Sequence, residues 1–201
     1  TVAIIDLSQF SESSAGKFGE AVRAVLLKDP VGLVLDLRND PGGFLESAVD
    51  VAGQWVPQDV IVVEQFSDGT RREYRSDGGA RLTEMPTVVL VNGGSASASE
   101  IVAGELQDYG FATLVGTQTF GKGSVQDYRE LEDGSAVKIT TAEWYTPKGR
   151  TIHEVGIMPD HEILFAVEDF QSCIDPQHDV ALQILFGTYV SPSEESETLT
   201  E

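Results

Sequence analysis

Residues 31–43 have the sequence VGLVLDLRNDPGG, and this stretch decides the fold class. Its first part is a nearly continuous run of Val and Leu. Such a run is typical of a strand buried on both faces, as in a parallel sheet covered by helices. The NDPGG that follows is a strong turn signal. We therefore expect a buried strand that ends in a glycine turn.

Outward from this stretch, predicted strands and helices alternate along the chain. Strands are expected at residues 1–7, 86–92 and 112–118, and helices at 11–29, 44–56 and 96–110. Two strand pairs are expected around Asp68-Gly69 and Asp133-Gly134, and two closing helical pieces at 167–170 and 179–187. The alternation predicts an α/β fold with a largely parallel central sheet covered by helices.

Composition excludes several classes of function. The chain has 201 residues, enough for one domain, with 13 Lys and Arg against 33 Asp and Glu and a net charge of −20. This charge would repel phosphate backbones, so no nucleic-acid partner is expected, and the acidic residues are expected to form a solvated surface. No apolar run approaches the ~20 residues of a transmembrane segment. No metal-ligand cluster is visible, so no metal and no cofactor are expected.

The two ends of the sequence differ in character. Thr1 begins directly with a strand-like segment and no signal-peptide pattern, so we expect that upstream residues have been removed. We expect a globular core at residues 1–187 and an acidic, disordered tail at 188–201, because residues 191–201 are polar and lack apolar anchors. The single cysteine, Cys173, has no partner for an internal disulfide.

The densest chemical signal is VNGGSASASEI, residues 91–101. A serine in the turn between a buried strand and a helix is exposed beside free N–H groups and the positive end of the helix dipole. Such a serine is a candidate nucleophile if a base removes its proton. Ser95, Ser97 and Ser99 all qualify, and periodicity does not choose among them. All three are also explained as turn formers or helix caps.

Lys122 is the candidate base. None of the histidines His153, His161 and His178 lies in a glycine-rich turn with an acid partner nearby, whereas Lys122 lies in FGKG, residues 120–123. The flanking glycines let the backbone approach another segment closely. A lysine enclosed in an apolar pocket is partly neutral near pH 7 and takes protons. The alternative is a solvent-exposed lysine in a flexible turn.

Residues 91–126 resemble the signature of the carboxyl-terminal processing proteases, also called tail-specific proteases. DLRNDPGG at 36–43, TAEWYTPKGRTI at 141–152 and GIMPD at 156–160 agree with the same family in the same order. The resemblance runs from about residue 1 to about residue 165, and more weakly through ALQILFG at 181–187. It implies a ClpP/crotonase-like core, with residues 1–187 as the catalytic part.

The resemblance also implies roles for individual residues. The family's nucleophile is the middle serine of SASAS, here Ser97, and its general base is the lysine of FGKG, here Lys122. The glutamine four positions further on, Gln126, positions or supports the lysine. The implied activity is a serine endopeptidase that works through an acyl-enzyme.

Further positions of the motif imply an oxyanion hole. The backbone amide after the nucleophile, that of Ala98, is one expected donor. The glycine turn supplies the other, which we assign to Gly43 with Gly42 beside it. Glu100 matches a family acid three residues past the nucleophile, with a structural or substrate-orienting role.

The resemblance further implies protein substrates, bound as an extended strand and cleaved near the C-terminus, and an extracytoplasmic setting in the periplasm or cell envelope. The family usually carries a peptide-binding PDZ module ahead of the conserved sheet. No GLG-type carboxylate-binding loop opens this sequence, so we expect either that this module was cut away or that this member lacks it. An upstream PDZ module or an activator protein is the partner that the resemblance implies.

Two alternatives are compatible with the same fold. One is a catalytically silent peptide-binding scaffold, which the joint presence of Ser97, Lys122 and Gln126 argues against. The other is an acyl-CoA enzyme of the crotonase class. That function requires a basic site for the CoA phosphates, and this acidic chain fits it poorly.

Overall fold

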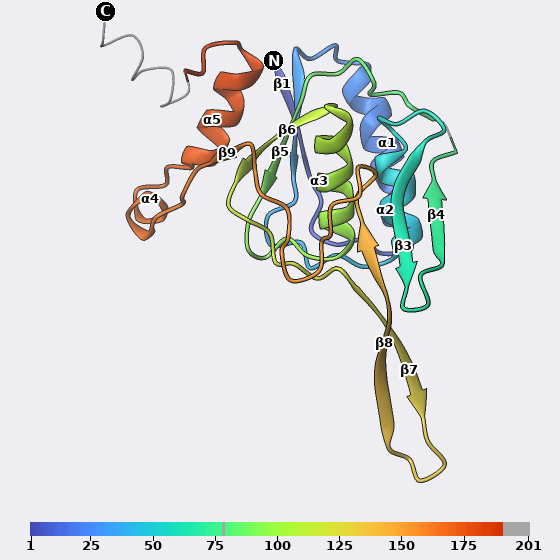
Figure 1. Cartoon of the computed structure of the whole chain (residues 1–201). Helices are drawn as coiled ribbons and strands as arrows, with labels where there is room; N and C mark the ends of the chain where they lie inside the picture. Colours follow the sequence, from blue (N-terminus) through green and yellow to red (C-terminus); the bar gives the residue numbers. More distant parts are fainter. Residues whose placement is uncertain (78, 191–201) are drawn as a thin grey trace, which may run out of the picture.

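The structure is a computed structural model that describes residues 1–77 and 79–190. A five-stranded parallel sheet forms its centre, in the order β1-β2-β5-β6-β9 (Figure 1). Its strands are β1 (Val2–Asp6), β2 (Gly32–Asp36), β5 (Thr87–Val91), β6 (Ala112–Gly116) and β9 (His161–Glu162). The predicted α/β class with a largely parallel sheet is therefore confirmed. β9 was not predicted, because a two-residue strand carries no periodic signal.

Helices cover both faces of this sheet, so its central strands are buried on both faces. Alternate residues Leu33 and Leu35 of β2 face the larger core, whereas Val34 faces a smaller one. The larger core is covered by α1 (Ser14–Leu26), α2 (Leu45–Ala52) and α3 (Ala98–Tyr109). The smaller core is covered by α5 (Pro176–Leu185), which packs Ala181 on the sheet, while α4 (Val167–Gln171) has no buried residue.

A second, antiparallel sheet has the strand order β4-β3-β8-β7. It contains the expected pairs, β3 (Val60–Phe66) with β4 (Arg71–Arg75) and β7 (Ser124–Glu130) with β8 (Ala136–Tyr145). The pairing of β3 with β8 joins the two hairpins into one sheet. Outside the body of the protein, β7 and β8 extend as a long hairpin (Figure 1).

Among the expected boundaries, α3 ends as predicted, with Gly110 in the left-handed conformation at φ 76°. α1 and α2 are shorter than the predicted helical segments. Most of the predicted tail, residues 191–201, lies outside the described residues.

The order of the sheet brings three loops together. β2, β5 and β6 are parallel neighbours, so their carboxyl ends lie side by side at the same end of the sheet. The loop after β2 carries the glycine turn, the loop after β5 carries the three serines, and the loop after β6 carries Lys122. Ligand sites of open α/β sheets form at the carboxyl ends of the strands.

Candidate active site

The three serines occupy different environments. Ser95 and Ser99 are fully buried, and their hydroxyls donate to backbone carbonyls, Ser95 Oγ to Leu37 O at 2.8 Å and Ser99 Oγ to Asp40 O at 2.9 Å. Both hydroxyls thus attach the serine loop to the loop after β2. Ser97 is half-buried. Of the three, it is the one that remains accessible to a substrate.

The backbone at Ser97 is strained. Its φ of 57° and ψ of −114° lie outside the regions that residues with a Cβ usually adopt. This conformation places Ser97 at the N-terminus of α3, where the first backbone amides have no partner within the helix. Strained residues of this kind cluster at functional sites.

Glu100 joins the serine loop to the lysine loop. Its carboxylate is fully buried and accepts four hydrogen bonds, two on each oxygen. Oε2 accepts from the backbone N–H groups of Ser97 and Lys122, both at 2.8 Å. Oε1 accepts from Thr119 Oγ1 and from the backbone N–H of Gly121, both at 2.6 Å. A buried carboxylate needs this degree of hydrogen bonding, so the two loops stabilise it while it holds them together.

The glycine turn lies directly against Ser97. A Cβ on Gly42, whose φ is 91°, would lie 2.5 Å from Ala96 O and 2.8 Å from both Ala98 N and Ser97 Cβ. Any side chain at Gly42 would therefore displace the serine loop. The structure thus brings Gly42 beside Ser97 and Ala98.

The two expected oxyanion donors are free to bind a ligand. The bridge between Phe10 and Gly43 uses Phe10 N–H to Gly42 O and Phe44 N–H to Phe10 O, and it leaves the amide of Gly43 unused. Within the described residues, neither Gly43 N–H nor Ala98 N–H donates to a protein acceptor. The positive end of α3 adds to the attraction for a negative charge.

Asp40 is a site residue that the sequence analysis missed. Its Oδ1 accepts from Gly42 N–H at 2.8 Å, and its carbonyl accepts from Ala96 N–H and Ser99 Oγ. Asp40 therefore fixes the turn and attaches it to the serine loop. An Asp that binds its own backbone two residues on is a recognised turn signal, and the DPGG sequence offered it.

Burial raises the pKa of Asp40 to about 6, the charge of Asp6 raises it to a smaller extent, and the hydrogen bond from Gly42 N–H opposes the rise. The second carboxylate oxygen, Oδ2, is buried and has no hydrogen-bond partner among the described residues. A protonated carboxyl at this position avoids placing an unpaired charge beside the turn.

Lys122 is exposed, so the expectation that an apolar pocket encloses it is wrong for this chain. The glycine-flanked turn holds its backbone rather than its side chain: Gly121 and Lys122 donate to Glu100, and Gly121 O accepts from Glu154 N–H at 2.9 Å. Gln126, the fourth residue after Lys122, is also exposed on β7.

His153 lies closer to the lysine loop than the sequence indicated. A Cβ on Gly123 would clash with His153 N, so the backbones of the two segments touch. His153 Nδ1 is buried and has no hydrogen-bond partner among the described residues. His153 therefore needs testing as an alternative base.

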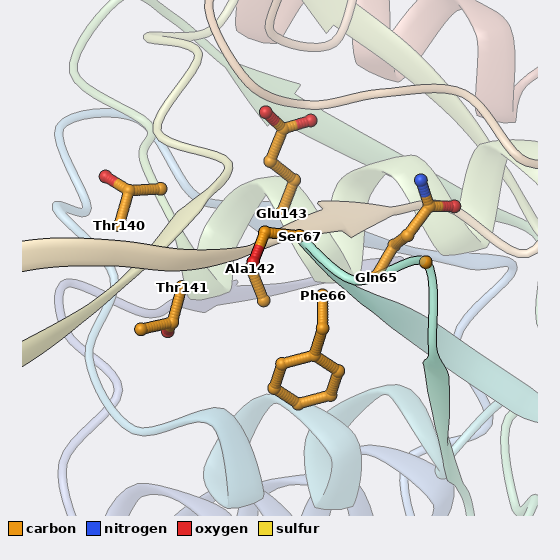
Figure 2. Close-up of a pocket in the computed structure, with 8 residues that line it drawn as sticks. Gln65, Phe66, Ser67, Thr140, Thr141, Ala142 and Glu143 are labelled. Carbon is orange, nitrogen blue, oxygen red and sulfur yellow. The ribbon is translucent and has the colours of Figure 1, made fainter.

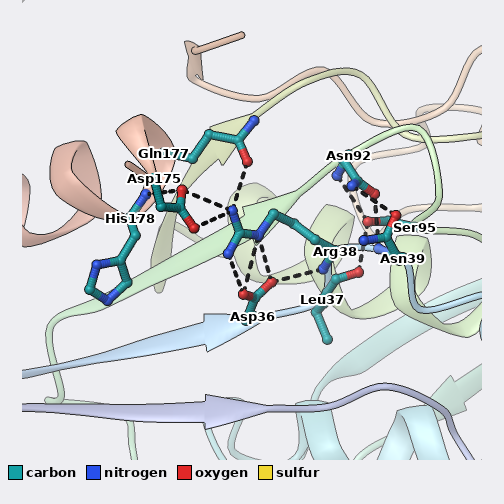
Figure 3. Close-up of polar contacts among 9 residues, drawn as sticks. All are labelled: Asp36, Leu37, Arg38, Asn39, Asn92, Ser95, Asp175, Gln177 and His178. Atoms are coloured by element: carbon teal, nitrogen blue, oxygen red, sulfur yellow. Dashed lines mark hydrogen bonds and ion pairs between the residues drawn. The ribbon is translucent and has the colours of Figure 1, made fainter. Parts of the chain in front are cut away.

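A charged network anchors α5 near the glycine turn (Figure 3). Arg38 pairs with Asp36 at 2.7 Å and with Asp175, at the start of α5, at 2.8 Å. Arg38 also donates to Gln177 Oε1 at 3.1 Å. Next to Arg38, Asn39 and Asn92 exchange hydrogen bonds of 2.9 and 3.1 Å. The loops after β2 and β5 are thus fixed to each other and to α5.

A pocket of about 250 Å³ lies at the root of the long hairpin, between β3 and β8 (Figure 2). Its lining consists of Gln65, Phe66, Ser67, Gly69, Thr140, Thr141, Ala142 and Glu143. None of the candidate catalytic residues lines it, so this pocket does not mark the site.

Two further features of the described residues bear on function. Among residues 1–77 and 79–190, no group of His, Cys, Asp and Glu is arranged to hold a metal ion. Within the same residues, no helix combines the length and the apolar character needed to cross a membrane.

Comparison with known proteins settles the family. A model of peptidase family S41 matches residues 1–163. The chain belongs to peptidase family S41. It is 43% identical over 190 residues to a carboxyl-terminal-processing protease of Synechocystis sp., a match that covers 93% of this chain and 44% of that protein. It is also 43% identical over 157 residues to the chloroplastic carboxyl-terminal-processing peptidase 3 of Arabidopsis thaliana, a match that covers 78% of this chain and 30% of that protein.

Solved structures of the S41 family agree with this assignment. The photosystem II D1 C-terminal processing protease superposes with a TM-score of 0.77 at 37% identity, covering 81% of this chain and 42% of that one. The resemblance of the chain to the carboxyl-terminal processing proteases is therefore confirmed. The S41 chain spans less than half the length of the relatives named here.

Proposed function

We propose that this S41 chain is the catalytic part of a serine endopeptidase in which Ser97 is the nucleophile and Lys122 the general base. The observation that carries the proposal is the Glu100 carboxylate, which binds the backbones of both residues through one oxygen. The different burial of Ser95, Ser97 and Ser99 supports Ser97 as the nucleophile. The family supplies the class of reaction.

In the proposed reaction, the neutral amine of Lys122 takes the proton of Ser97 Oγ, and the oxygen attacks the carbonyl carbon of a peptide bond. The amides of Gly43 and Ala98 stabilise the oxyanion. Lys122 then protonates the leaving amine, which departs from the acyl-enzyme. Water hydrolyses the acyl-enzyme, with Lys122 again accepting the proton. Gln126 supports Lys122.

Exposed Lys122 imposes a condition on this mechanism. In water the charged ammonium form is favoured, and exclusion of water favours the neutral amine. We infer that a bound substrate covers Lys122. A PDZ-type module or an activator protein would assist by delivering the substrate and aligning Ser97 with Lys122.

The substrates we propose are proteins, bound as an extended strand and cleaved near their C-termini. Relatives named for carboxyl-terminal processing support this choice, and we place the activity outside the cytoplasm, in the periplasm or cell envelope. The alternative is a silent peptide-binding scaffold.

Preference for C-terminal tails is tested with one unstructured tail attached either to the C-terminus or to the N-terminus of the same folded carrier. Mass spectrometry of the products should locate cleavage in the C-terminal tail, with the N-terminal fusion cleaved much more slowly. Equal cleavage of both fusions would contradict the preference for C-terminal tails. Binding of the tails without any cleavage would favour the scaffold.

A further inference from the structure

The strand that follows Lys122 has a free edge. β7 is the terminal strand of the β4-β3-β8-β7 sheet, and β8 is its one partner within the described residues. The hairpin extends away from the body of the protein, so this edge faces open space (Figure 1). A free edge presents unpaired N–H and C=O groups and is a template for another strand.

Hydrogen bonds at both ends of the hairpin fix which residues face the free edge. Trp144 N–H donates to Gly123 O at 2.7 Å, and Leu131 N–H donates to Ser135 O at 2.8 Å. In an antiparallel pair, backbone groups point alternately toward the partner and away from it. Gly123 and Leu131 both point toward β8, and alternation from either of them gives the same set of outward residues. The residues whose backbone groups face outward are Ser124, Gln126, Tyr128 and Glu130.

The irregularity in this hairpin does not disturb the alternation. Val125 pairs with Ala142 and Gln126 pairs with Thr140, so the extra residue, Thr141, lies in β8. Bulges occur next to active sites, where they redirect a strand. Here the bulge leaves β7 continuous from Ser124 onward.

The free edge begins at the candidate catalytic residues. Ser124, the first outward-facing residue, is two positions after Lys122, whose backbone shares the Glu100 Oε2 atom with Ser97. β4, at the other edge of the same sheet, is separated from β7 by β3 and β8. A strand added to β7 would therefore pass close to Lys122, which is exposed.

We propose that the free edge of β7 binds the substrate, as an extended peptide that pairs with the outward backbone groups of Ser124, Gln126 and Tyr128. This inference rests on the proposed peptidase function, and it names the surface at which the substrate is bound. From Ser124 to Tyr128 the edge spans about 13 Å, so about five peptide residues on one side of the cleaved bond would pair with it. The same peptide would cover Lys122 and exclude water from it.

An extended peptide suits this edge because alternating N–H and C=O groups are complementary to another extended backbone. Side chains contribute less, since Tyr128 is 58% exposed on one face of the hairpin and Ile139 is 47% exposed on the other. Recognition through the backbone would tolerate many sequences.

The test uses Tyr128→Pro and Tyr128→Ala. Proline removes the outward N–H of residue 128 and is tolerated at a strand edge where that group faces solvent. Tyr128→Ala removes the side chain and keeps the N–H. The probe is a fluorescein-labelled unstructured peptide of about ten residues, selected as one that the wild-type protein cleaves. Its affinity is measured by fluorescence anisotropy in a Ser97→Ala background and its KM in the active protein.

We expect Tyr128→Pro to raise both the dissociation constant and KM about tenfold, the effect of losing roughly one backbone hydrogen bond. The kcat and the unfolding temperature should stay unchanged, and Tyr128→Ala should stay within about twofold of wild type. N-methylation of single peptide positions should weaken binding with a period of two residues.

Equal affinities for Tyr128→Pro and Tyr128→Ala, in folded proteins, would overturn the proposal. So would a conversion of dimer to monomer by Tyr128→Pro without a change in peptide affinity, which would identify the edge as a contact between two copies. Failure of the proposed function has a different result: wild type and Ser97→Ala would then degrade peptides equally.

Discussion

The backbone N–H groups of Ser97 and Lys122 donate to one and the same atom, Oε2 of Glu100, each at a distance of 2.8 Å. The two residues belong to loops after different strands, so no local turn sets their separation. Glu100 therefore sets it, from a buried position in the first turn of α3. Catalytic groups must be held to within about half an ångström, and this carboxylate provides such a constraint.

Glu100→Gln should reduce activity strongly. The amide NH₂ of glutamine would face two of the four donors that now bind the carboxylate, and those donors would lose their acceptor. We expect kcat/KM to fall about 100-fold, the effect of a misplacement of about 1 Å. The free energy of unfolding should fall by about 2–4 kcal/mol. Steady-state kinetics and urea unfolding measure the two effects, and wild-type activity in a folded variant would contradict this role.

Glu105→Gln is the matched control in the same helix, and it should stabilise the protein. Burial raises the pKa of Glu105 well above its ordinary value, with a further contribution from Asp108, and neither carboxylate oxygen has a partner among the described residues. Because the folded-state pKa is raised, stability is fully present at low pH and is lost as the pH rises through that pKa.

At pH 8 we expect Glu105→Gln to gain about 1–3 kcal/mol over wild type in urea unfolding, the cost of an unpaired buried group. The gain should shrink toward pH 4, and activity should stay unchanged. A destabilised variant at pH 8 would show that Glu105 is paired in solution.

Replacing each of the three serines by alanine should affect activity and stability differently. Ser97→Ala should abolish peptide hydrolysis with little loss of stability. Ser95→Ala and Ser99→Ala should keep part of the activity and lose about 1 kcal/mol each, because each removes one of the hydrogen bonds that a buried carbonyl accepts. Thermal unfolding and peptide hydrolysis, measured side by side, check this. Full activity in Ser97→Ala would show that another residue is the nucleophile.

Asp40 should act through the turn that it fixes. Asp40→Ala removes the acceptor of Gly42 N–H, so we expect kcat to fall about tenfold or more while KM changes little. Asp40→Asn keeps an acceptor oxygen and should restore most of the rate. Equal kcat in all three proteins would show that this hydrogen bond does not position the oxyanion donors.

The raised pKa of Asp40 also predicts the direction in which stability changes with pH. Because it rises from 3.8 to about 6, the wild type should lose stability as the pH increases from about 4 to above 6. Since Glu105 contributes in the same direction, the informative quantity is the difference between wild type and Asp40→Asn. An identical pH dependence in both would contradict the assignment.

Much of this architecture was predictable from sequence because its signals are local. The Val and Leu run of 31–38 and the turn before α3 identify their elements without tertiary information. The Asp133-Gly134 turn likewise predicts the β7–β8 pair. The pairing of β3 with β8 was not predicted, since the two strands are far apart in the sequence and neither contains a signal for the other.

The site was predictable as a set of residues and not as an arrangement. Motif spacing identifies Ser97 and Lys122 through family resemblance, but the role of Glu100 depends on the meeting of the serine loop and the lysine loop in the folded protein. The exposure of Lys122 was also not predictable, because flanking glycines are equally compatible with an enclosed and an open turn. Asp40 was missed although its turn chemistry is local.

The most direct measurement of the central claim is the hydrolysis of an unfolded test protein by wild type, Ser97→Ala, Lys122→Ala and His153→Ala across pH 5–10. We expect the first two variants to lose at least about 1,000-fold in rate, and His153→Ala to keep the wild-type rate throughout this pH range. A rate controlled by a group titrating near ~6.5, lost in His153→Ala and retained in Lys122→Ala, would contradict the account.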